Sequence, residues 1–249
     1  MAGVYKFILL YTRQFRLLVG GLVRHRRCKP ASRIAAFLTH HRINLILDVG
    51  GHHGEFGLAL RRHGYQGEIR SFEPVAESFS ILQRRAVSDP KWHVFGFALG
   101  DVNASADIAV TRFSQMASLL PLSHNARALG RHADILSRER ITIHRLDDIV
   151  ATSPELRVFL KIDTQGFERQ VLEGAEALLE CCQGVMLELP LIQLYEDRWN
   201  LSEALDFMER NNFVLGQIHP VAYDPSDQVA LLEVDGLFRR RDKRDGASS

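Results

Sequence analysis

The chain has 249 residues, of which 31 are basic and 30 are acidic, so its formal net charge is +1. A charge this close to zero does not indicate a nucleic-acid partner, and we expect none. The length and the apolar content of 46% suit a globular α/β domain with a sizeable core. The three cysteines have no metal-binding spacing and predict no disulfide framework, so we expect a cytoplasmic protein.

Residues 1–30 form a basic extension with seven lysines and arginines and no acid. Apolar side chains recur there at steps of four and three, as expected for one stripe of a helix: Val4, Ile8, Tyr11, Phe15, Leu18 and Leu22. Arg13 and Arg16 interrupt the apolar run, which argues against a membrane span or a signal peptide. We favour packing of the stripe against the domain. Peripheral contact with an anionic membrane and a mitochondrial presequence stay open.

Residues 31–240 predict a single domain in which strands and helices alternate. After a helix over 33–42, the predicted strands cover 45–49, 68–72, 92–98, 158–162, 185–189, 213–218 and 234–239. The intervening helices are predicted at 55–63, 75–87, 166–181 and 201–210. This alternation is typical of an α/β, doubly wound parallel sheet.

One segment breaks the alternation. Residues 103–145 contain two short predicted strands, 106–110 and 141–145, around a stretch rich in serine and arginine. A long insertion inside a compact domain is often a substrate lid. The tail, residues 241–249, is expected to be disordered.

A glycine-rich turn follows the first strand, in the sequence Asp48-Val-Gly-Gly-His-His-Gly. Glycine lets the backbone turn sharply and approach a ligand without a Cβ in the way. The G-x-G-x-x-G spacing of dinucleotide sites fails from either Gly50 or Gly51, which opposes an NAD-dependent oxidoreductase. The pattern Asp-x-Gly-x-x-x-Gly instead resembles the first motif of class I methyltransferases, which bind S-adenosylmethionine. Glu73 follows Gly50 by 23 residues, close to the ~20 expected for an acid that binds ribose hydroxyls.

Further motifs follow in a fixed order: Phe72-Glu-Pro, Ala98-Leu-Gly-Asp101, Arg145-Leu-Asp-Asp, Leu160-Lys-Ile-Asp-Thr-Gln-Gly-Phe-Glu and Val171-Leu-Glu-Gly-Ala. Together they resemble the FkbM family of S-adenosylmethionine-dependent methyltransferases over about residues 45–240. The chain departs from the family at His52, where asparagine is usual, and at Gln165, where glutamate is common. The resemblance implies the Rossmann-like class I methyltransferase fold, a seven-stranded, mostly parallel sheet with an antiparallel edge hairpin.

The same resemblance implies where the cofactor lies. Asp48 and the N–H groups around Gly50, His52 and Gly54 would hold its methionine moiety, and Glu73 would accept the ribose hydroxyls. Ala98, Leu99 and Asp101 would border the adenine. Ser118, in the insertion, matches a family serine and would touch the cofactor or the substrate.

A hydroxyl acceptor is a weak nucleophile and needs a base or a metal ion. Asp163 and Glu188 end neighbouring predicted strands, where open α/β sheets place ligands. They are expected to form a general-base pair or to bind a divalent cation such as magnesium. The alternatives are that Asp163 caps the following helix and that Glu188 pairs with an arginine. His219 is a secondary candidate for the base.

The expected function is S-adenosylmethionine-dependent O-methylation. The family resemblance implies a sugar, glycan or polyketide-type acceptor. A non-catalytic cofactor-binding or membrane-associated scaffold of the same fold is the alternative from another functional class.

Overall fold

The computed structural model describes residues 30–112, 114–126, 134–224, 227 and 229–242. The expectations for the apolar stripe of the basic extension and for the last residues of the tail lie outside these ranges. Within them, no helix combines the length and the apolar character that crossing a bilayer requires.

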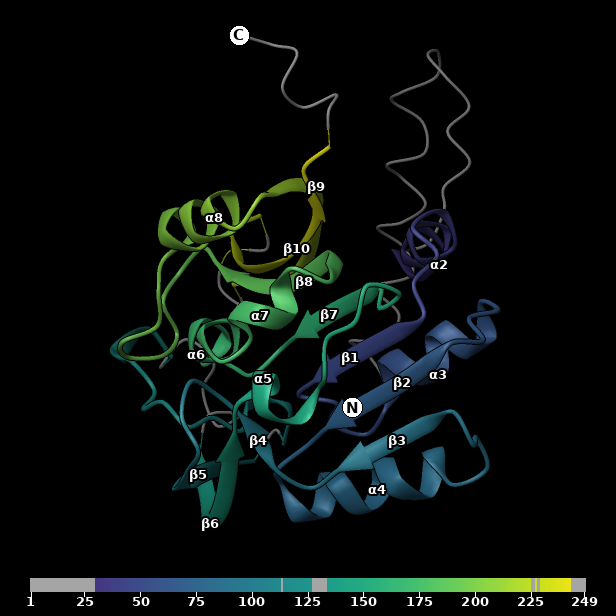
Figure 1. Cartoon of the computed structure of the whole chain (residues 1–249). Helices are drawn as coiled ribbons and strands as arrows, with labels where there is room; N and C mark the ends of the chain where they lie inside the picture. Colours follow the sequence, from purple (N-terminus) through teal and green to yellow (C-terminus); the bar gives the residue numbers. More distant parts are fainter. Residues whose placement is uncertain (1–29, 113, 127–133, 225–226, 228, 243–249) are drawn as a thin grey trace, which may run out of the picture.

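A central sheet of seven strands, in the order β3-β2-β1-β7-β8-β10-β9, confirms the expected fold (Figure 1). The strands are β1 (Leu45–Val49), β2 (Glu68–Phe72), β3 (Trp92–Phe95), β7 (Val158–Ile162), β8 (Cys182–Pro190), β9 (Phe213–Tyr223) and β10 (Leu231–Arg240). β10 pairs antiparallel with both β8 and β9, whereas the pairs among β3, β2, β1, β7 and β8 are parallel. The expected antiparallel edge hairpin is therefore β9–β10.

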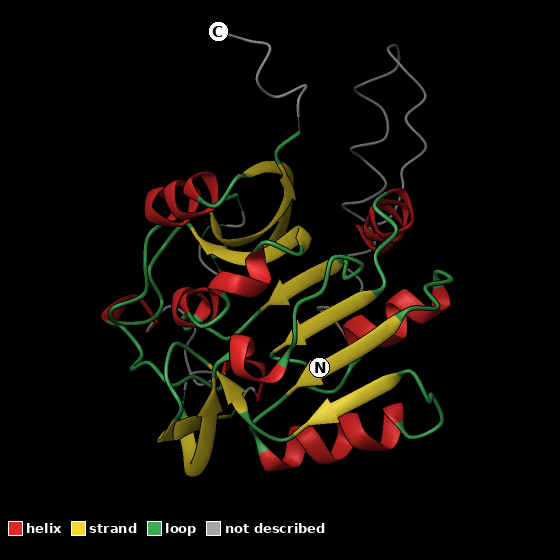
Figure 2. Ribbon diagram, in the orientation of Figure 1, coloured by secondary structure: helices red, strands yellow, loops and turns green. Residues whose placement is uncertain are grey.

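Helices cover both faces of this sheet (Figure 2). They are α2 (Pro30–His40), α3 (Glu55–Arg62), α4 (Ala76–Ala86), α5 (Leu146–Ile149), α6 (Glu168–Glu173), α7 (Glu176–Leu179) and α8 (Leu201–Arg210). One apolar cluster joins the sheet to α2, α3 and α4, and another joins it to α5, α6, α7 and α8. All residues of β1 and β7 are buried, as expected for central parallel strands covered on both sides.

Two predicted elements are shorter than expected. The helix predicted over 166–181 is split into α6 and α7 at Gly174, where a Cβ would lie 1.9 Å from the Gly100 carbonyl oxygen. β8 begins at Cys182, earlier than the strand predicted over 185–189. The strand predicted over 92–98 ends at Phe95, and the chain enters a separate strand, β4 (Ala98–Leu99).

The predicted insertion contains a second sheet. β5 (Ala104–Thr111) and β6 (Ile135–His144) pair antiparallel, and β4 pairs parallel with β6. A short 3-10 helix, η1 (Ser114–Met116), follows β5. An isolated bridge between Ala109 and Ser118 holds the segment after η1 against β5. The strands of the insertion thus lie beside the carboxyl ends of the central strands (Figure 1).

Candidate active site

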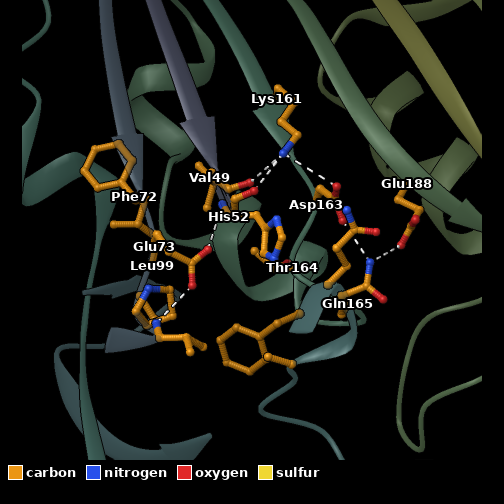
Figure 3. A pocket seen from close by; sticks show the side chains of 18 of the residues that line it. Val49, His52, Phe72, Glu73, Leu99, Lys161, Asp163, Thr164, Gln165 and Glu188 are labelled. Carbon is orange, nitrogen blue, oxygen red and sulfur yellow. Dashed lines mark hydrogen bonds and ion pairs between the residues drawn. The ribbon is translucent and has the colours of Figure 1, made fainter. Parts of the chain in front are cut away.

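A cavity of about 360 Å³ lies beyond the carboxyl ends of β1, β2, β7 and β8. Two walls face it (Figure 3). Gly50, His52, Glu73 and Leu99 belong to what we term the glycine-loop wall, and Asp163, Gln165, Glu188 and Asp235 to the acidic wall. Side chains of the insertion, including Ser114 and Leu119, also line the cavity.

The glycine loop turns tightly because a neighbouring chain segment lies against it. Gly50 has a φ of +71°, and a Cβ there would lie 1.8 Å from the Asp163 carbonyl oxygen. The N–H groups of Gly50 and Gly51 both donate to the Phe72 carbonyl, at 3.0 and 2.9 Å. Gly54 has a φ of +85°, precedes α3 and donates to the Gly51 carbonyl. These three N–H groups are thus bonded within the protein, and the expected contact of the loop with the cofactor stays a prediction.

Asp48 also differs from expectation, because it is fully buried and does not line the cavity. Its carboxylate accepts a hydrogen bond from the Ser71 hydroxyl at 2.9 Å and lies 3.2 Å from Lys161 Nζ. Lys161 does line the cavity, and its ammonium donates to the Gly50 carbonyl at 2.9 Å. Burial lowers the pKa of Lys161, but the charges of Asp48 and Asp163 outweigh burial and raise this pKa above its ordinary value. Asp48 therefore acts on the cavity through Lys161.

Glu73 presents a nearly buried carboxylate at the end of β2. It accepts the His52 N–H at 2.8 Å and the Val75 N–H at 2.9 Å. Burial raises the pKa of Glu73 to about 7. Apolar atoms of Phe97, Ala98 and Leu99 line the cavity beside it.

Asp101 does not line this part of the cavity. Its carbonyl oxygen instead accepts a hydrogen bond from Arg145.

The insertion is tied to both walls. His52 Nε2 lies 2.9 Å from the Ser114 hydroxyl, which links the glycine loop to η1. The Ser118 hydroxyl donates to the Gln165 carbonyl at 2.7 Å and accepts the Leu120 N–H at 3.0 Å. Ser118 is buried and does not line the cavity. Instead of touching a ligand directly, as expected, it anchors the insertion to the acidic wall.

Asp163 and Glu188 do lie together, as their strand positions predict, but an amide bridges them. Gln165 Nε2 donates to Asp163 and to Glu188, each at 2.9 Å (Figure 3). The Gln165 amide oxygen accepts a hydrogen bond from the Tyr195 hydroxyl at 2.8 Å, which fixes the amide orientation. Gln165, noted from the sequence only as a departure from the family, is thus the centre of the acidic wall.

Glu188 also pairs with an arginine, Arg198, which was the alternative expected from the sequence. Arg198 is fully buried and lies 3.5 Å from the Glu188 carboxylate and 3.4 Å from that of Glu168, and it pairs with Glu233. Burial and the neighbouring Asp163 charge nevertheless raise the pKa of Glu188 well above its ordinary value. Asp163 does not cap α6, because Glu168 accepts the N–H groups of Thr164 and Gly166.

Asp235 is a cavity residue that the sequence analysis missed. β10 places it directly opposite Glu188 on one side and His219 on the other. Residues opposite each other in an antiparallel pair present their side chains on the same face, so Asp235 adds a third carboxyl to the acidic wall. Burial, then the charge of Asp163, raise the pKa of Asp235 to about 7. His219 does not line the cavity, and burial and Arg33 lower its pKa.

The family model of the methyltransferase FkbM domain matches residues 48–215. The chain belongs to this family. As a member it is an S-adenosylmethionine-dependent methyltransferase, which sets aside the NAD-dependent oxidoreductase and the non-catalytic scaffold.

"Methyltransferase 1" of Beauveria bassiana (strain ARSEF 2860) is 26% identical over 206 residues, which cover 76% of this chain and 80% of that protein. Two solved structures are similar at low identity. An rRNA methylase from Streptococcus thermophilus has a TM-score of 0.48 and 8% identity, covering 89% of this chain and 100% of that one. Magnesium protoporphyrin IX methyltransferase from Synechocystis PCC 6803, with bound S-adenosylmethionine, has a TM-score of 0.43 and 11% identity, covering 92% and 90%.

Proposed function

We propose that this methyltransferase acts on a hydroxyl group of a sugar, a glycan or a polyketide-type metabolite. The observation that carries the proposal is the Asp235 carboxyl, which lines the cavity wall. Burial and the charge of Asp163 raise the pKa of this carboxyl to about 7. A hydroxyl loses its proton during methylation, and a base works best when its pKa is near the working pH. The sugar or polyketide class of acceptor comes from the family resemblance.

The chemistry of the walls fits the donor. S-adenosylmethionine supplies a methyl group that its sulfonium already activates, so the protein mainly aligns the reactants. The Glu73 carboxylate is suited to accept ribose hydroxyls, and Phe97 and Leu99 offer an apolar surface for adenine. His52 would border the same group through its contact with Ser114.

The acidic wall would orient and deprotonate the acceptor. The Asp163 side chain is 41% exposed, whereas the Glu188 side chain is only 5% exposed. Asp163 is therefore placed to orient the acceptor through a hydroxyl beside the reacting one, and Asp235 to accept the hydrogen bond of the reacting hydroxyl and then its proton. Glu188, nearly buried and bonded to Gln165, positions the amide that holds Asp163.

A divalent cation does not fit between Asp163 and Glu188 as they lie. The gap between their oxygens is bridged by the Gln165 amide nitrogen, which is a hydrogen-bond donor and not a metal ligand. In the described part of the chain, His52, His53 and Glu55 are grouped closely enough to share an ion, but Arg85 already donates to Glu55 at 2.7 Å. We therefore propose a metal-independent reaction, and expect full activity in the presence of a chelator.

The basic extension adds a second element to the proposal. Its arginines and apolar stripe suit reversible contact with an anionic membrane surface, where a lipid-linked sugar would be available. Sedimentation with anionic vesicles, compared between the full chain and a variant in which the seven basic residues of 1–30 are glutamines, tests this contact.

Transfer of labelled methyl from S-adenosylmethionine to candidate glycans and lipid-linked sugars, read by mass spectrometry, tests the reaction. We expect a methyl ether on a hydroxyl oxygen, and Asp163→Asn should reduce product formation while calorimetry still detects S-adenosylhomocysteine binding. Methylation of an amine or a carboxylate, or full activity of Asp163→Asn, would contradict the proposal.

A further inference from the structure

We infer that the part of the acceptor entering this cavity is uncharged or cationic, and that a phosphate or carboxylate of the acceptor stays away from the acidic wall. This inference rests on the proposed function and narrows its substrate class. Proteins bind anionic groups most strongly through arginine, lysine or free backbone N–H groups. Among the described residues, Lys161, Arg198 and two N–H groups after β7 are such donors near the acidic wall, and each is engaged within the protein.

The first source is Lys161, the one lysine or arginine that lines the cavity among the described residues. Its ammonium is surrounded by four acceptors, the carbonyls of Gly50 at 2.9 Å and Val49 at 3.5 Å and the carboxylates of Asp48 at 3.2 Å and Asp163 at 3.6 Å. An ammonium has three protons to donate. The acceptors within the protein already outnumber these protons, so an acceptor phosphate would have to displace one of them.

The second source is Arg198, behind Glu188. Its side chain is 0% exposed, and it is enclosed by the carboxylates of Glu168, Glu188 and Glu233. It also donates to the Glu188 carbonyl at 3.1 Å. Three acids around one guanidinium leave this cluster negative when all are ionised. Arg198 therefore cannot serve an anion in the cavity.

The third source is the backbone after β7. The N–H groups of Thr164 and Gly166 point toward the carboxylate of Glu168, at 3.2 and 3.0 Å. A carboxylate of the protein itself thus fills the position that a ligand anion would take at the start of α6. In the loop after β1, the N–H groups of Gly50 and Gly51 donate to the Phe72 carbonyl, and that of His52 donates to the Glu73 carboxylate.

The acidic wall has three carboxyls, and the donors near it are all engaged within the protein. Glu188 and Asp235 are cross-strand partners, and Asp163 shares the Gln165 amide with Glu188. An anionic group among them would meet the charge of Asp163, and that of Asp235 once it has lost its proton, in a partly buried site where water screens poorly. Sugar hydroxyls, by contrast, donate hydrogen bonds that carboxylates accept, and a cationic acceptor would be attracted.

Anion-exchange fractionation of a glycan and metabolite extract separates the two classes of acceptor. The full chain is incubated with methyl-labelled S-adenosylmethionine and either the unretained, neutral and cationic fraction or the retained, anionic fraction. We expect on the order of tenfold more labelled methyl ether in the unretained fraction. Labelled methyl ether mainly in the retained fraction, on the sugar or unit that itself carries the phosphate or carboxylate, would overturn the inference and leave the proposed O-methylation standing. Binding of S-adenosylhomocysteine without labelled product in either fraction would contradict the proposed function itself, and the inference with it.

Val221 offers a matched pair of variants. It lines the cavity from β9 and its residue is 44% exposed, so a longer side chain has room without disturbing the core. Val221→Arg should raise labelling of the retained fraction several-fold relative to Val221→Gln, because only the first supplies a free guanidinium. The same ratio of retained to unretained label in both variants would show that charge does not select the acceptor, and would overturn the inference.

Discussion

The two walls of the cavity are built in different ways. The glycine-loop wall comes from β1, β2 and the turns that follow them, and its hydrogen bonds join segments about 20 residues apart. The acidic wall joins β7, β8 and β10, and its antiparallel pairing brings Asp235 opposite Glu188. Residues that follow strands of neighbouring βα units, such as Glu73 and Asp163, lie in short sequence motifs, whereas Asp235, which distant strand pairing brings to the cavity, lies in none.

The walls also differ in charge. In the glycine-loop wall, the Glu73 carboxylate is matched by two backbone N–H groups. The acidic wall holds more carboxyls than its two cations can neutralise, because Lys161 and Arg198 are shared with Asp48, Glu168 and Glu233. A surplus of buried carboxyls raises their pKa values, as for Glu188 and Asp235, and makes proton uptake possible near neutral pH.

Gly50→Ala should have the largest effect, because Gly50 is where the two walls meet. The new Cβ would lie 1.8 Å from the Asp163 carbonyl oxygen, and a φ of +71° is strained for alanine. We expect a loss of unfolding free energy on the order of 4 kcal/mol and loss of measurable S-adenosylhomocysteine binding. Gly64→Ala is the matched control: its φ is +89° but a Cβ would have nothing within 4 Å. Chemical denaturation and calorimetry compare the two variants, and equal losses would contradict a role for the close approach.

Arg198→Met would remove the buried cation that pairs with Glu188 of the acidic wall. It leaves three buried carboxyls around an apolar side chain, with an expected loss of about 3–5 kcal/mol of unfolding free energy at neutral pH. Without the guanidinium, the folded-state pKa values of Glu188 and Glu233, which burial already raises, rise further above the unfolded values. The folded state then binds more protons, and the variant should regain stability relative to wild type as the pH falls. Urea unfolding at neutral and mildly acidic pH measures this, with the exposed Arg140→Met as control; a pH-independent difference would contradict it.

Asp235→Asn tests the acidic wall as the source of the base. We expect kcat to fall by about a hundredfold with unchanged S-adenosylhomocysteine affinity, because the amide cannot take a proton. For the wild type, kcat should rise with pH and level off above about pH 7, since the carboxyl must first lose its own proton. Measurement at saturating donor removes any effect of Glu73 on cofactor binding. Asp107→Asn, on β5 and paired with Arg140, is the control; an unaltered pH profile in Asp235→Asn would assign the base elsewhere.

The contrast between the walls also explains what could be predicted from the sequence. The Asp48-to-Gly54 loop and Glu73 lie beside their strands, so local patterns indicated the fold and one side of the cavity. The spacing did not reveal that Asp48 is buried and does not line the cavity, because all residues of β1 are buried and the strand has no alternating exposed face. Asp235 was missed for a different reason. Its position depends on the register between β8 and β10, which a single sequence does not specify.

Glu73→Gln would sharpen the assignment of the glycine-loop wall. Loss of a charged acceptor for the ribose hydroxyls should weaken S-adenosylhomocysteine binding by about 1.5–3 kcal/mol, roughly ten- to a hundredfold. Hydroxyl donors favour the ionised carboxyl, whose pKa in the free protein is about 7. Wild-type affinity should therefore fall as the pH drops below this value, whereas the variant's affinity should change less. Calorimetry across this pH range measures the affinity, and the exposed Glu77→Gln is the control. If Glu73→Gln binds S-adenosylhomocysteine as tightly as Glu77→Gln and the wild type do, the assignment of Glu73 is wrong.

Ser118→Ala should have the smallest effect, because it loosens one tie between the insertion and the acidic wall and leaves both walls in place. The variant loses the hydrogen bond to the Gln165 carbonyl, with an expected cost of about 1 kcal/mol in unfolding free energy. Since Gln165 holds Asp163 and Glu188 together, kcat should fall a few-fold while S-adenosylhomocysteine affinity is retained. The exposed Ser105→Ala, on β5, should change neither quantity. If Ser118→Ala instead weakened cofactor binding with kcat unchanged, the serine would belong to the cofactor site, as the family resemblance first implied.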